Sequence, residues 1–133
     1  MKLAGKVLVV DDEAHIRKFV TLYLRSMGDI TVMEAANGTE ALQIYEREKP
    51  QLVLLDVNMP RLDGLQTLRN LKRSDPACVV VMLTSLVNRQ TVEECLRLHA
   101  LGYLRKDTLP DEMMAQLLKF VTAALNPNPA PPA

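Results

Sequence analysis

The chain has 133 residues, 48% of them hydrophobic, which suits one domain with a packed core and leaves no room for a second full domain. Its 16 basic and 16 acidic side chains cancel, so it lacks the basic excess typical of nucleic-acid-binding domains. The first apolar run is too short for a signal peptide and no run reaches the ~20 residues of a membrane span, so we expect a cytoplasmic protein that binds neither nucleic acid nor membrane directly.

The first half of the chain alternates short apolar runs with segments of helical periodicity. Gly28 is expected to end the first helix as its C′ residue, Asn37 supplies N-cap chemistry for the second, and Pro50 prevents that helix from continuing. The apolar face of the first helix is predicted to contain Ile16, Phe19, Val20, Tyr23, Leu24 and Met27. The expected elements are strand 6–10, helix 13–27, strand 30–35, a helix from 37–39 to about 49, and strand 52–55.

The second half repeats the alternation. A loop rich in turn formers, 56–64, leads to a helix marked by Leu65, Leu68 and Leu71 and closed by 74–76. There follow strand 79–83, helix 88–100 with Val92, Cys95, Leu96, Leu98 and His99 near its inner edge, strand 101–105, and a last helix opened by 107–110. The stripe predicted to be buried in that last helix is Met113, Met114, Leu117, Leu118, Val121 and Leu125.

This order of elements predicts an α/β fold with a doubly wound, five-stranded parallel sheet covered by helices on both faces. The strand order 2-1-3-4-5, which is flavodoxin-like, is the commoner solution at this size, and the structure would have five helices. We expect one domain over residues 1–125, followed by a Pro-rich tail or linker at 126–133.

Four of the predicted strands end at polar residues of different chemical kinds. Asp11-Asp12 follow the first strand, Asp56 the third, Thr84-Ser85 the fourth and Lys106 the fifth. The carboxyl ends of parallel strands meet at one edge of a sheet, where ligands bind. Three carboxylates, a hydroxyl and an ammonium group at one edge could hold a divalent cation and a phosphoryl group.

Magnesium fits the carboxylates best, because it prefers oxygen ligands and neighbouring carboxylates repel one another unless a cation intervenes. Zinc does not fit, since neither His15 nor His99 has a partner at ligand spacing, and Cys78 and Cys95 are expected to be reduced and partly buried.

Each polar residue at the strand ends has a predicted role and a simpler alternative. Asp56, at the end of the central strand, is the best candidate for a nucleophile that becomes an aspartyl phosphate. Thr84 could bond a phosphoryl oxygen, and Lys106 could neutralise the acidic cluster. Taken singly, Asp11, Asp12 and Asp56 also fit capping or turn positions, Thr84 a strand end, and Lys106 a surface lysine.

These residues resemble the receiver domain of two-component response regulators, the chemotaxis-regulator-like family. The resemblance covers residues 5 to about 125 and rests on four motifs in the right order, VLVVDDE, LVLLDVNMPRLDG, VVVMLTS and GYLRK. Any one of the motifs is weak, whereas the ordered set is highly specific.

The resemblance implies a phosphorylation-controlled signalling switch rather than an enzyme acting on external substrates. Asp56 would accept a phosphoryl group from a sensor histidine kinase or a small phosphodonor and lose it slowly by self-hydrolysis. Mg²⁺ would be bound directly by Asp12 and Asp56, through water by Asp11, and by the backbone carbonyl of Asn58. Thr84 and Lys106 would contact the phosphoryl group.

The resemblance also implies how the signal leaves the domain. The rotamer of Tyr103 would follow Thr84 and report the phosphorylation state on the face formed by the fourth helix, fifth strand and fifth helix. A downstream effector protein or domain, or a second copy of the chain, would bind that face.

The sequence departs from the family pattern at three positions. Asp107 follows Lys106 where the family usually has a proline in a cis bond, so we expect a trans bond or a rearranged loop. His99 replaces a common glycine before the fifth strand and tolerates left-handed geometry less well. Leu86 stands where many relatives are polar, and we hypothesise that it slows loss of the phosphoryl group.

Three other functions are compatible with parts of the pattern. A degenerate receiver would act as a phosphorylation-independent interaction module, and Asp107 keeps that alternative open. A haloacid-dehalogenase-like phosphatase would need a second aspartate as general acid where Asn58 stands. A flavodoxin-like cofactor binder would need a phosphate loop rich in Gly, Ser and Thr, whereas residues 11–13 are all acidic.

Overall fold

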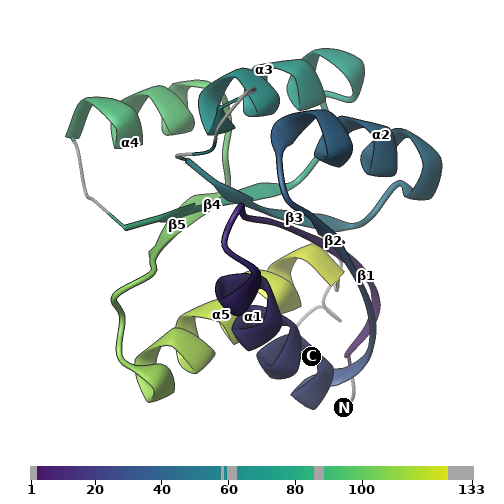
Figure 1. Cartoon of the computed structure of the whole chain (residues 1–133), viewed down its shortest axis with the longest axis vertical. Coiled ribbons are helices and arrows are strands. Elements are labelled where there is room, and N and C mark those ends of the chain that lie inside the picture. Colours follow the sequence, from purple (N-terminus) through teal and green to yellow (C-terminus); the bar gives the residue numbers. More distant parts are fainter. Residues whose placement is uncertain (1–2, 58, 60–62, 86–88, 126–133) are drawn as a thin grey trace, which may run out of the picture.

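The computed structural model describes residues 3–57, 59, 63–85 and 89–125 (Figure 1). Helices and strands alternate strictly along this part of the chain. They are β1 (Leu3–Val10), α1 (Ala14–Ser26), β2 (Gly28–Ala35), α2 (Gly38–Glu48), β3 (Leu52–Asp56), α3 (Gly64–Ser74), β4 (Val80–Thr84), α4 (Arg89–Arg97), β5 (Gly102–Arg105) and α5 (Pro110–Leu125).

The strands form one five-stranded parallel sheet in the order β2-β1-β3-β4-β5. Helices α2, α3 and α4 cover one face, and α1 and α5 cover the other (Figure 1). The predicted fold class, with its strand order and five helices, is therefore confirmed.

The central strands are buried on both faces, as their continuous apolar sequences indicate. Every residue of β3 and β4 is buried, and so is the second half of β1. Two hydrophobic clusters result, one on each face of the sheet. Together they fix the carboxyl ends of β1, β3 and β4 side by side, where the predicted site residues lie.

Gly28 occupies the predicted C′ position of the first helix, but without the left-handed helical conformation that is usual there. The C-cap of α1 is Met27, in a right-handed conformation, and Gly28 already begins β2, opposite Leu3 of β1. Its φ is 154°, and a Cβ atom there would lie 2.1 Å from the carbonyl oxygen of Leu3. Glycine is needed because the backbone of β1 passes directly over this position.

Four residues predicted to face the core lie at the surface. His99 is exposed, and the exposed fractions of the others are 50% for Phe19, 52% for Leu96 and 42% for Leu118. Helical periodicity identifies a helix and its average apolar direction, but each buried stripe is narrower than the apolar sequence pattern. In α1 the buried residues are Val20, Thr21 and Leu24, and in α5 they are Met113, Leu117, Val121 and Ala124.

Several other expectations concern single positions. Cys78 and Cys95 are free thiols and are buried. No described peptide bond is cis, so the bond between Lys106 and Asp107 is trans. Among the described helices, none combines the length and hydrophobicity that crossing a bilayer requires. The Pro-rich segment predicted at 126–133 lies outside the described residues.

Candidate functional site

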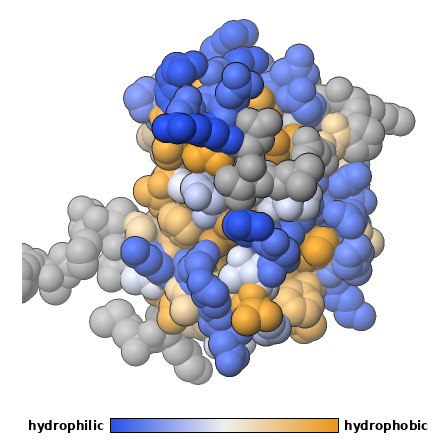
Figure 2. All heavy atoms as spheres, turned by 90° about the vertical axis from the view of Figure 1, so that its left-hand side faces the viewer, coloured by the Kyte–Doolittle hydropathy of each residue, from blue (hydrophilic) through white to orange (hydrophobic). Residues whose placement is uncertain are grey.

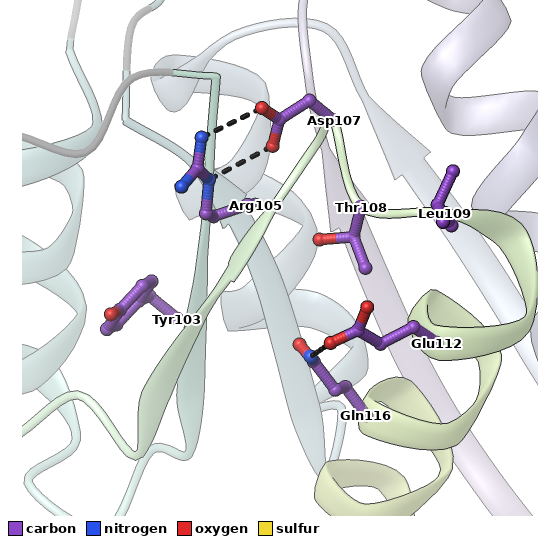
Figure 3. Close-up of a pocket in the computed structure, with 7 residues that line it drawn as sticks. All are labelled: Tyr103, Arg105, Asp107, Thr108, Leu109, Glu112 and Gln116. Atoms are coloured by element: carbon purple, nitrogen blue, oxygen red, sulfur yellow. Dashed lines mark hydrogen bonds and ion pairs between the residues drawn. The ribbon is translucent and has the colours of Figure 1, made fainter.

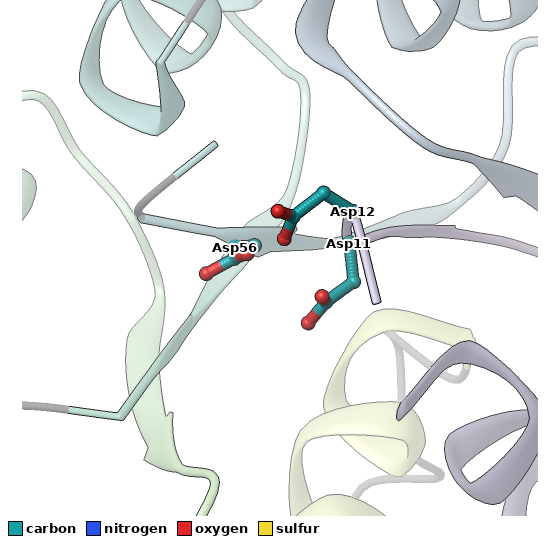
Figure 4. Close-up of side chains that lie close together, drawn as sticks. All are labelled: Asp11, Asp12 and Asp56. Carbon is teal, nitrogen blue, oxygen red and sulfur yellow. The ribbon is translucent and has the colours of Figure 1, made fainter. Parts of the chain in front are cut away.

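Three aspartates converge at the carboxyl edge of the sheet. Asp11 and Asp12 follow β1, and Asp56 ends the neighbouring strand β3 (Figure 4). Each offers a carboxylate oxygen, and these three oxygens lie within 4.8 Å of one another. Asp11 and Asp56 are buried, whereas Asp12 is exposed. The sequence placed these three residues at one edge, and the structure brings them together.

Lys106, the residue after β5, brings its ammonium group into this acidic cluster. Its Nζ lies 2.7 Å from Oδ2 of Asp11 and 3.2 Å from Oδ1 of Asp56. A hydrogen bond from the Lys106 amide to the Thr84 carbonyl oxygen, 2.8 Å, continues the pairing of β4 with β5 and aims the side chain across the sheet edge. Lys106 is therefore not a surface lysine: its side chain is only 10% exposed.

The electrostatics of the cluster favour a charged Lys106. Burial alone lowers the pKa of the ammonium group, but the bond to Asp11 and the charges of Asp56 and Asp11 outweigh it. The pKa of Lys106 is therefore raised above its ordinary value. The stabilisation that this ion pairing gives to the fold is present below pH ~10.4 and is lost as the pH rises through the higher pKa of the folded state.

Asp11 is held by hydrogen bonds to its backbone amide, its backbone carbonyl group and its carboxylate. Its amide donates to the carbonyl oxygen of Ala35 on β2, and its Oδ1 accepts from the amide of Glu13 at 2.9 Å. Its carbonyl oxygen accepts from the guanidinium of Arg17 at 2.7 Å. With its other carboxylate oxygen paired to Lys106, Asp11 is a rigid anchor, and Asp12 and Asp56 are better placed to bind a cation directly.

The first residues of helix α3 lie close to the backbone of Asp56 and Val57. Asp63 caps it by accepting a hydrogen bond from the Gln66 amide at 2.9 Å, and the Gly64 amide donates to the carbonyl oxygen of Val57. A Cβ atom on Gly64 would lie 2.2 Å from the carbonyl oxygen of Asp56. The glycine thus lets the start of α3 rest against the backbone of the candidate nucleophile.

The other predicted site residues have different surroundings. Thr84 ends β4 and is buried, with an exposed fraction of 4%. Tyr103 on β5 is 39% exposed and its ring does not lie in the cluster. Asn58, predicted to supply a backbone carbonyl, and Leu86 both lie outside the described residues.

Tyr103 lines a hollow of about 500 Å³ between β5 and the start of α5 (Figure 3). Arg105 and Asp107 form a two-point ion pair beside it, with Nε–Oδ1 and Nη2–Oδ2 distances of 3.0 and 2.8 Å. This pair turns the Asp107 carboxylate towards Arg105. Asp107 therefore adds no further negative charge to the partners of Lys106 among the described residues.

The surface formed by α4, β5 and α5 mixes polar and apolar residues, with hydrophobic residues exposed between hydrophilic ones (Figure 2). The large hydrophobic side chains exposed on these elements and the turn before β5 are Leu96, Leu101, Tyr103 and Leu118. A surface of this composition can bind another protein.

Sequence reasoning missed three residues that support the site: Glu13, Arg17 and Gly64. Glu13 Oε1 is a third carboxylate oxygen near Lys106, at 3.4 Å. Its place directly after two aspartates was a usable signal, and so was the basic Arg17 in the first turn of a helix. Nothing in the sequence indicated that Gly64 touches the backbone of Asp56, because that contact depends on the path of the loop between β3 and α3.

The residues present fit a divalent cation of the magnesium type. All three converging ligands are carboxylate oxygens, and one buried ammonium group leaves the cluster with excess negative charge. No thiol or imidazole of the described residues belongs to the cluster, so the soft donors that zinc prefers are lacking there.

Comparison with known proteins identifies relatives of the whole fold. A sequence model of the response regulator receiver domain matches residues 7–118. The chain is 36% identical over 110 residues to an uncharacterized transcriptional regulatory protein, YhcZ, of Bacillus subtilis, covering 82% of this chain and 51% of that protein. It is 31% identical over 114 residues to the chemotaxis protein CheY of Listeria monocytogenes, covering 86% and 96%.

The solved structures to which this fold is similar come from the same family of proteins. The CheY structure from Borrelia burgdorferi, in a complex with CheX, BeF3 and Mg, has a TM-score of 0.81 and 31% identity, covering 89% of this chain and 87% of that one. The response regulator domain of Thermotoga maritima CheB has a TM-score of 0.83 and 29% identity, covering 93% and 98%. The chain thus spans about half the length of the transcriptional relative and nearly all of a CheY.

Proposed function

The chain belongs to the response regulator receiver domain family, and we propose that it is a switch controlled by Mg²⁺-dependent phosphorylation of Asp56. The observation that carries this proposal is the position of Lys106, whose ammonium group lies between the carboxylates of Asp11 and Asp56. A cation at this point can counter the charge of an incoming phosphoryl group.

Asp56 is the nucleophile in this proposal. One of its carboxylate oxygens attacks phosphorus, the bond from phosphorus to the donor breaks, and the donor leaves with the electron pair. With a phosphohistidine donor the leaving group is the imidazole of a sensor histidine kinase, and with acetyl phosphate it is acetate. Burial of Asp56 favours the reaction, because it keeps the carboxylate poorly solvated and therefore reactive.

The other site residues would hold the cation and neutralise the charge of the phosphoryl group. Asp12 and Asp56 would hold Mg²⁺ directly and Asp11 would do so through water, with the Asn58 carbonyl completing the protein ligands. When bound, Mg²⁺ supplies positive charge to the oxygens of the phosphoryl group. Lys106 keeps its ion pair with Asp11 while it bonds the new phosphoryl oxygens. Thr84, buried at the end of β4, donates its hydroxyl to another of them.

Output would follow from the change at Thr84. The aspartyl phosphate adds roughly −1.5 to −2 charges at one point, and an inward shift of the Thr84 hydroxyl would bias the rotamer of Tyr103 on the neighbouring strand. The α4–β5–α5 surface would then bind a downstream effector or a second copy of this chain. We place the receiver at 1–125, a linker or tail at 126–133, and the protein in the cytoplasm.

The test is a mass measurement after incubation with Mg²⁺ and acetyl phosphate. We expect the wild-type chain to gain one phosphoryl group, and Asp56→Asn, or the wild type in EDTA, to gain none. Asp63→Asn is the matched control, because Asp63 caps α3 beside the site and should leave phosphorylation intact. An unmodified wild type would contradict the proposal and favour a receiver that acts without phosphorylation.

A further inference from the structure

Arg17 makes two contacts that join α1 to the loop carrying the acidic cluster. Its Nη1 donates to the carbonyl oxygen of Asp11 at 2.7 Å, and its Nε pairs with Oε1 of Glu34 on β2 at 3.1 Å. The Arg17 side chain is 19% exposed and its bond to Asp11 is partly buried, whereas the Glu34 side chain is 45% exposed. The guanidinium group thus spans from the edge strand of the sheet to the backbone of the candidate cation site.

The position of Arg17 in its helix is locally unfavourable. It lies in the first turn of α1, where the helix dipole disfavours a positive charge. That turn holds no acidic residue, and the nearest acid along the helix is its N-cap residue, Glu13. The tertiary contacts of Arg17 with Asp11 and Glu34 add to its stabilisation at this position.

The carbonyl group that Arg17 binds belongs to the peptide linking Asp11 to Asp12. The amide of Asp11 is fixed to Ala35 and its Oδ1 to the amide of Glu13, so the contact from Arg17 completes the support of this loop. Within residues 3–57, 59, 63–85 and 89–125, no side chain bonds to the carboxylate of Asp12. The place of that exposed carboxylate is therefore set by its backbone.

We propose that Arg17, held by Glu34, is a positioning residue for the cation site, because it orients the Asp11–Asp12 peptide and thereby the carboxylate of Asp12. This inference rests on the proposed binding of Mg²⁺ at the three aspartates. It assigns Arg17 no contact with the cation or the phosphoryl group.

A positioning role and a simple charge effect of Arg17 predict opposite changes in Mg²⁺ affinity when the residue is replaced. If Arg17 acted only as a nearby positive charge, its removal would strengthen Mg²⁺ binding by reducing repulsion. If it orients the loop, its removal weakens binding, and loss of a group that orients a metal ligand typically costs about 10-fold or more in affinity. The sign of the change therefore separates the two explanations.

The experiment measures Mg²⁺ affinity by calorimetric titration of the full chain, without phosphodonor, for the wild type, Arg17→Met and Lys18→Met. Lys18 is the exposed neighbour of Arg17 on α1, so the control removes the same charge without a contact to the loop. We expect about a 10-fold weaker affinity in Arg17→Met and no change in Lys18→Met. Glu34→Gln, which removes only the charge that holds Arg17, should lie between them.

Phosphorylation by acetyl phosphate supplies the second measurement. The Mg²⁺ concentration giving half the maximal rate should rise in Arg17→Met, while the rate at saturating Mg²⁺ stays close to that of the wild type. Arg17→Lys, which keeps one donor, should recover part of the affinity, and it remains informative if Arg17→Met does not fold. Equal or tighter Mg²⁺ binding in the Arg17 variants would overturn the inference, whereas a wild type that binds no Mg²⁺ would instead refute the proposed function.

Discussion

His99 occupies a backbone conformation that suits glycine. Its φ is 67°, in the left-handed region, and it is the second residue after the end of α4. The amide of His99 donates to the carbonyl oxygen of Leu96, and that of Ala100 donates to the carbonyl oxygen of Cys95. These two bonds form a Schellman motif with His99 at C′, the position where glycine is most common.

We therefore predict that His99→Gly stabilises the protein. A left-handed conformation costs a non-glycine residue roughly 1–2 kcal/mol, and the greater freedom of glycine in the unfolded chain offsets part of that gain. We expect the free energy of unfolding in urea to rise by about 0.5–1 kcal/mol. The control Leu98→Gly, one residue earlier and without a positive φ, should lower it, and an equal fall in both variants would refute the explanation.

A buried tyrosine, Tyr45, links helix α2 to the end of helix α3. Tyr45 of α2 donates its hydroxyl to Oδ2 of Asp75, the C-cap residue of α3, at 2.6 Å. Burial, and then the bond to Asp75, raise the pKa of Tyr45, and the same bond lowers the pKa of Asp75. The link therefore stabilises the packing of α2 against the connection from α3 to β4.

Removing this hydrogen bond should destabilise the fold in a pH-dependent manner. Tyr45→Phe should lower the free energy of unfolding by about 1 kcal/mol at pH 7. Because the pKa of Asp75 is lowered in the folded state, the contribution is complete above the ordinary aspartate value of ~3.9 and is lost as the pH falls through the folded value.

Urea unfolding from pH 7 down to about pH 2 would measure this difference. The gap between wild type and Tyr45→Phe should narrow at the acidic end. Tyr23→Phe is the matched control, since the Tyr23 hydroxyl has no bond to another described residue. A gap that stays constant with pH would mean that Tyr45 acts through packing alone.

The sequence predicted correctly those features for which the local pattern and the contacts in the folded structure favour the same outcome. The apolar strands, the Asn37 cap and the convergence of Asp11, Asp12, Asp56 and Lys106 belong to this class, because parallel strands bring their carboxyl ends to one edge. Local signals were insufficient where a contact from another element decides the outcome: Gly28 stands at C′ as predicted, but its conformation is set by the backbone of Leu3. The prediction that Phe19 is buried was wrong, because the buried stripe of α1 is narrower than its apolar pattern.

At the scale of the whole molecule, formal neutrality conceals a strong local field. The chain has 16 basic and 16 acidic side chains, yet the edge of the sheet gathers three aspartates around one ammonium group. This excess of negative charge destabilises the folded state, because in the unfolded chain Asp56 lies far from Asp11 and Asp12 and all three carboxylates are hydrated. A cation that binds only the folded site should reverse the effect.

Mg²⁺ should therefore raise the thermal stability of the wild type. At a free concentration 100 times the dissociation constant, the expected gain is about 2.7 kcal/mol. Whether Asp12→Asn is more or less stable than the wild type should depend on whether Mg²⁺ is present. It relieves repulsion, so in EDTA the variant should unfold at a higher temperature than the wild type, but it loses a metal ligand, so at saturating Mg²⁺ it should unfold at a lower one.

Thermal unfolding at pH 7, in EDTA and in Mg²⁺, would test this reversal. Asp111→Asn is the control, because Asp111 is an exposed acid in the first turn of α5 and the substitution changes the net charge equally. It should keep the full gain from Mg²⁺. If Asp12→Asn also kept that gain, or were less stable than the wild type in EDTA, the three aspartates would not be the site through which Mg²⁺ stabilises the fold.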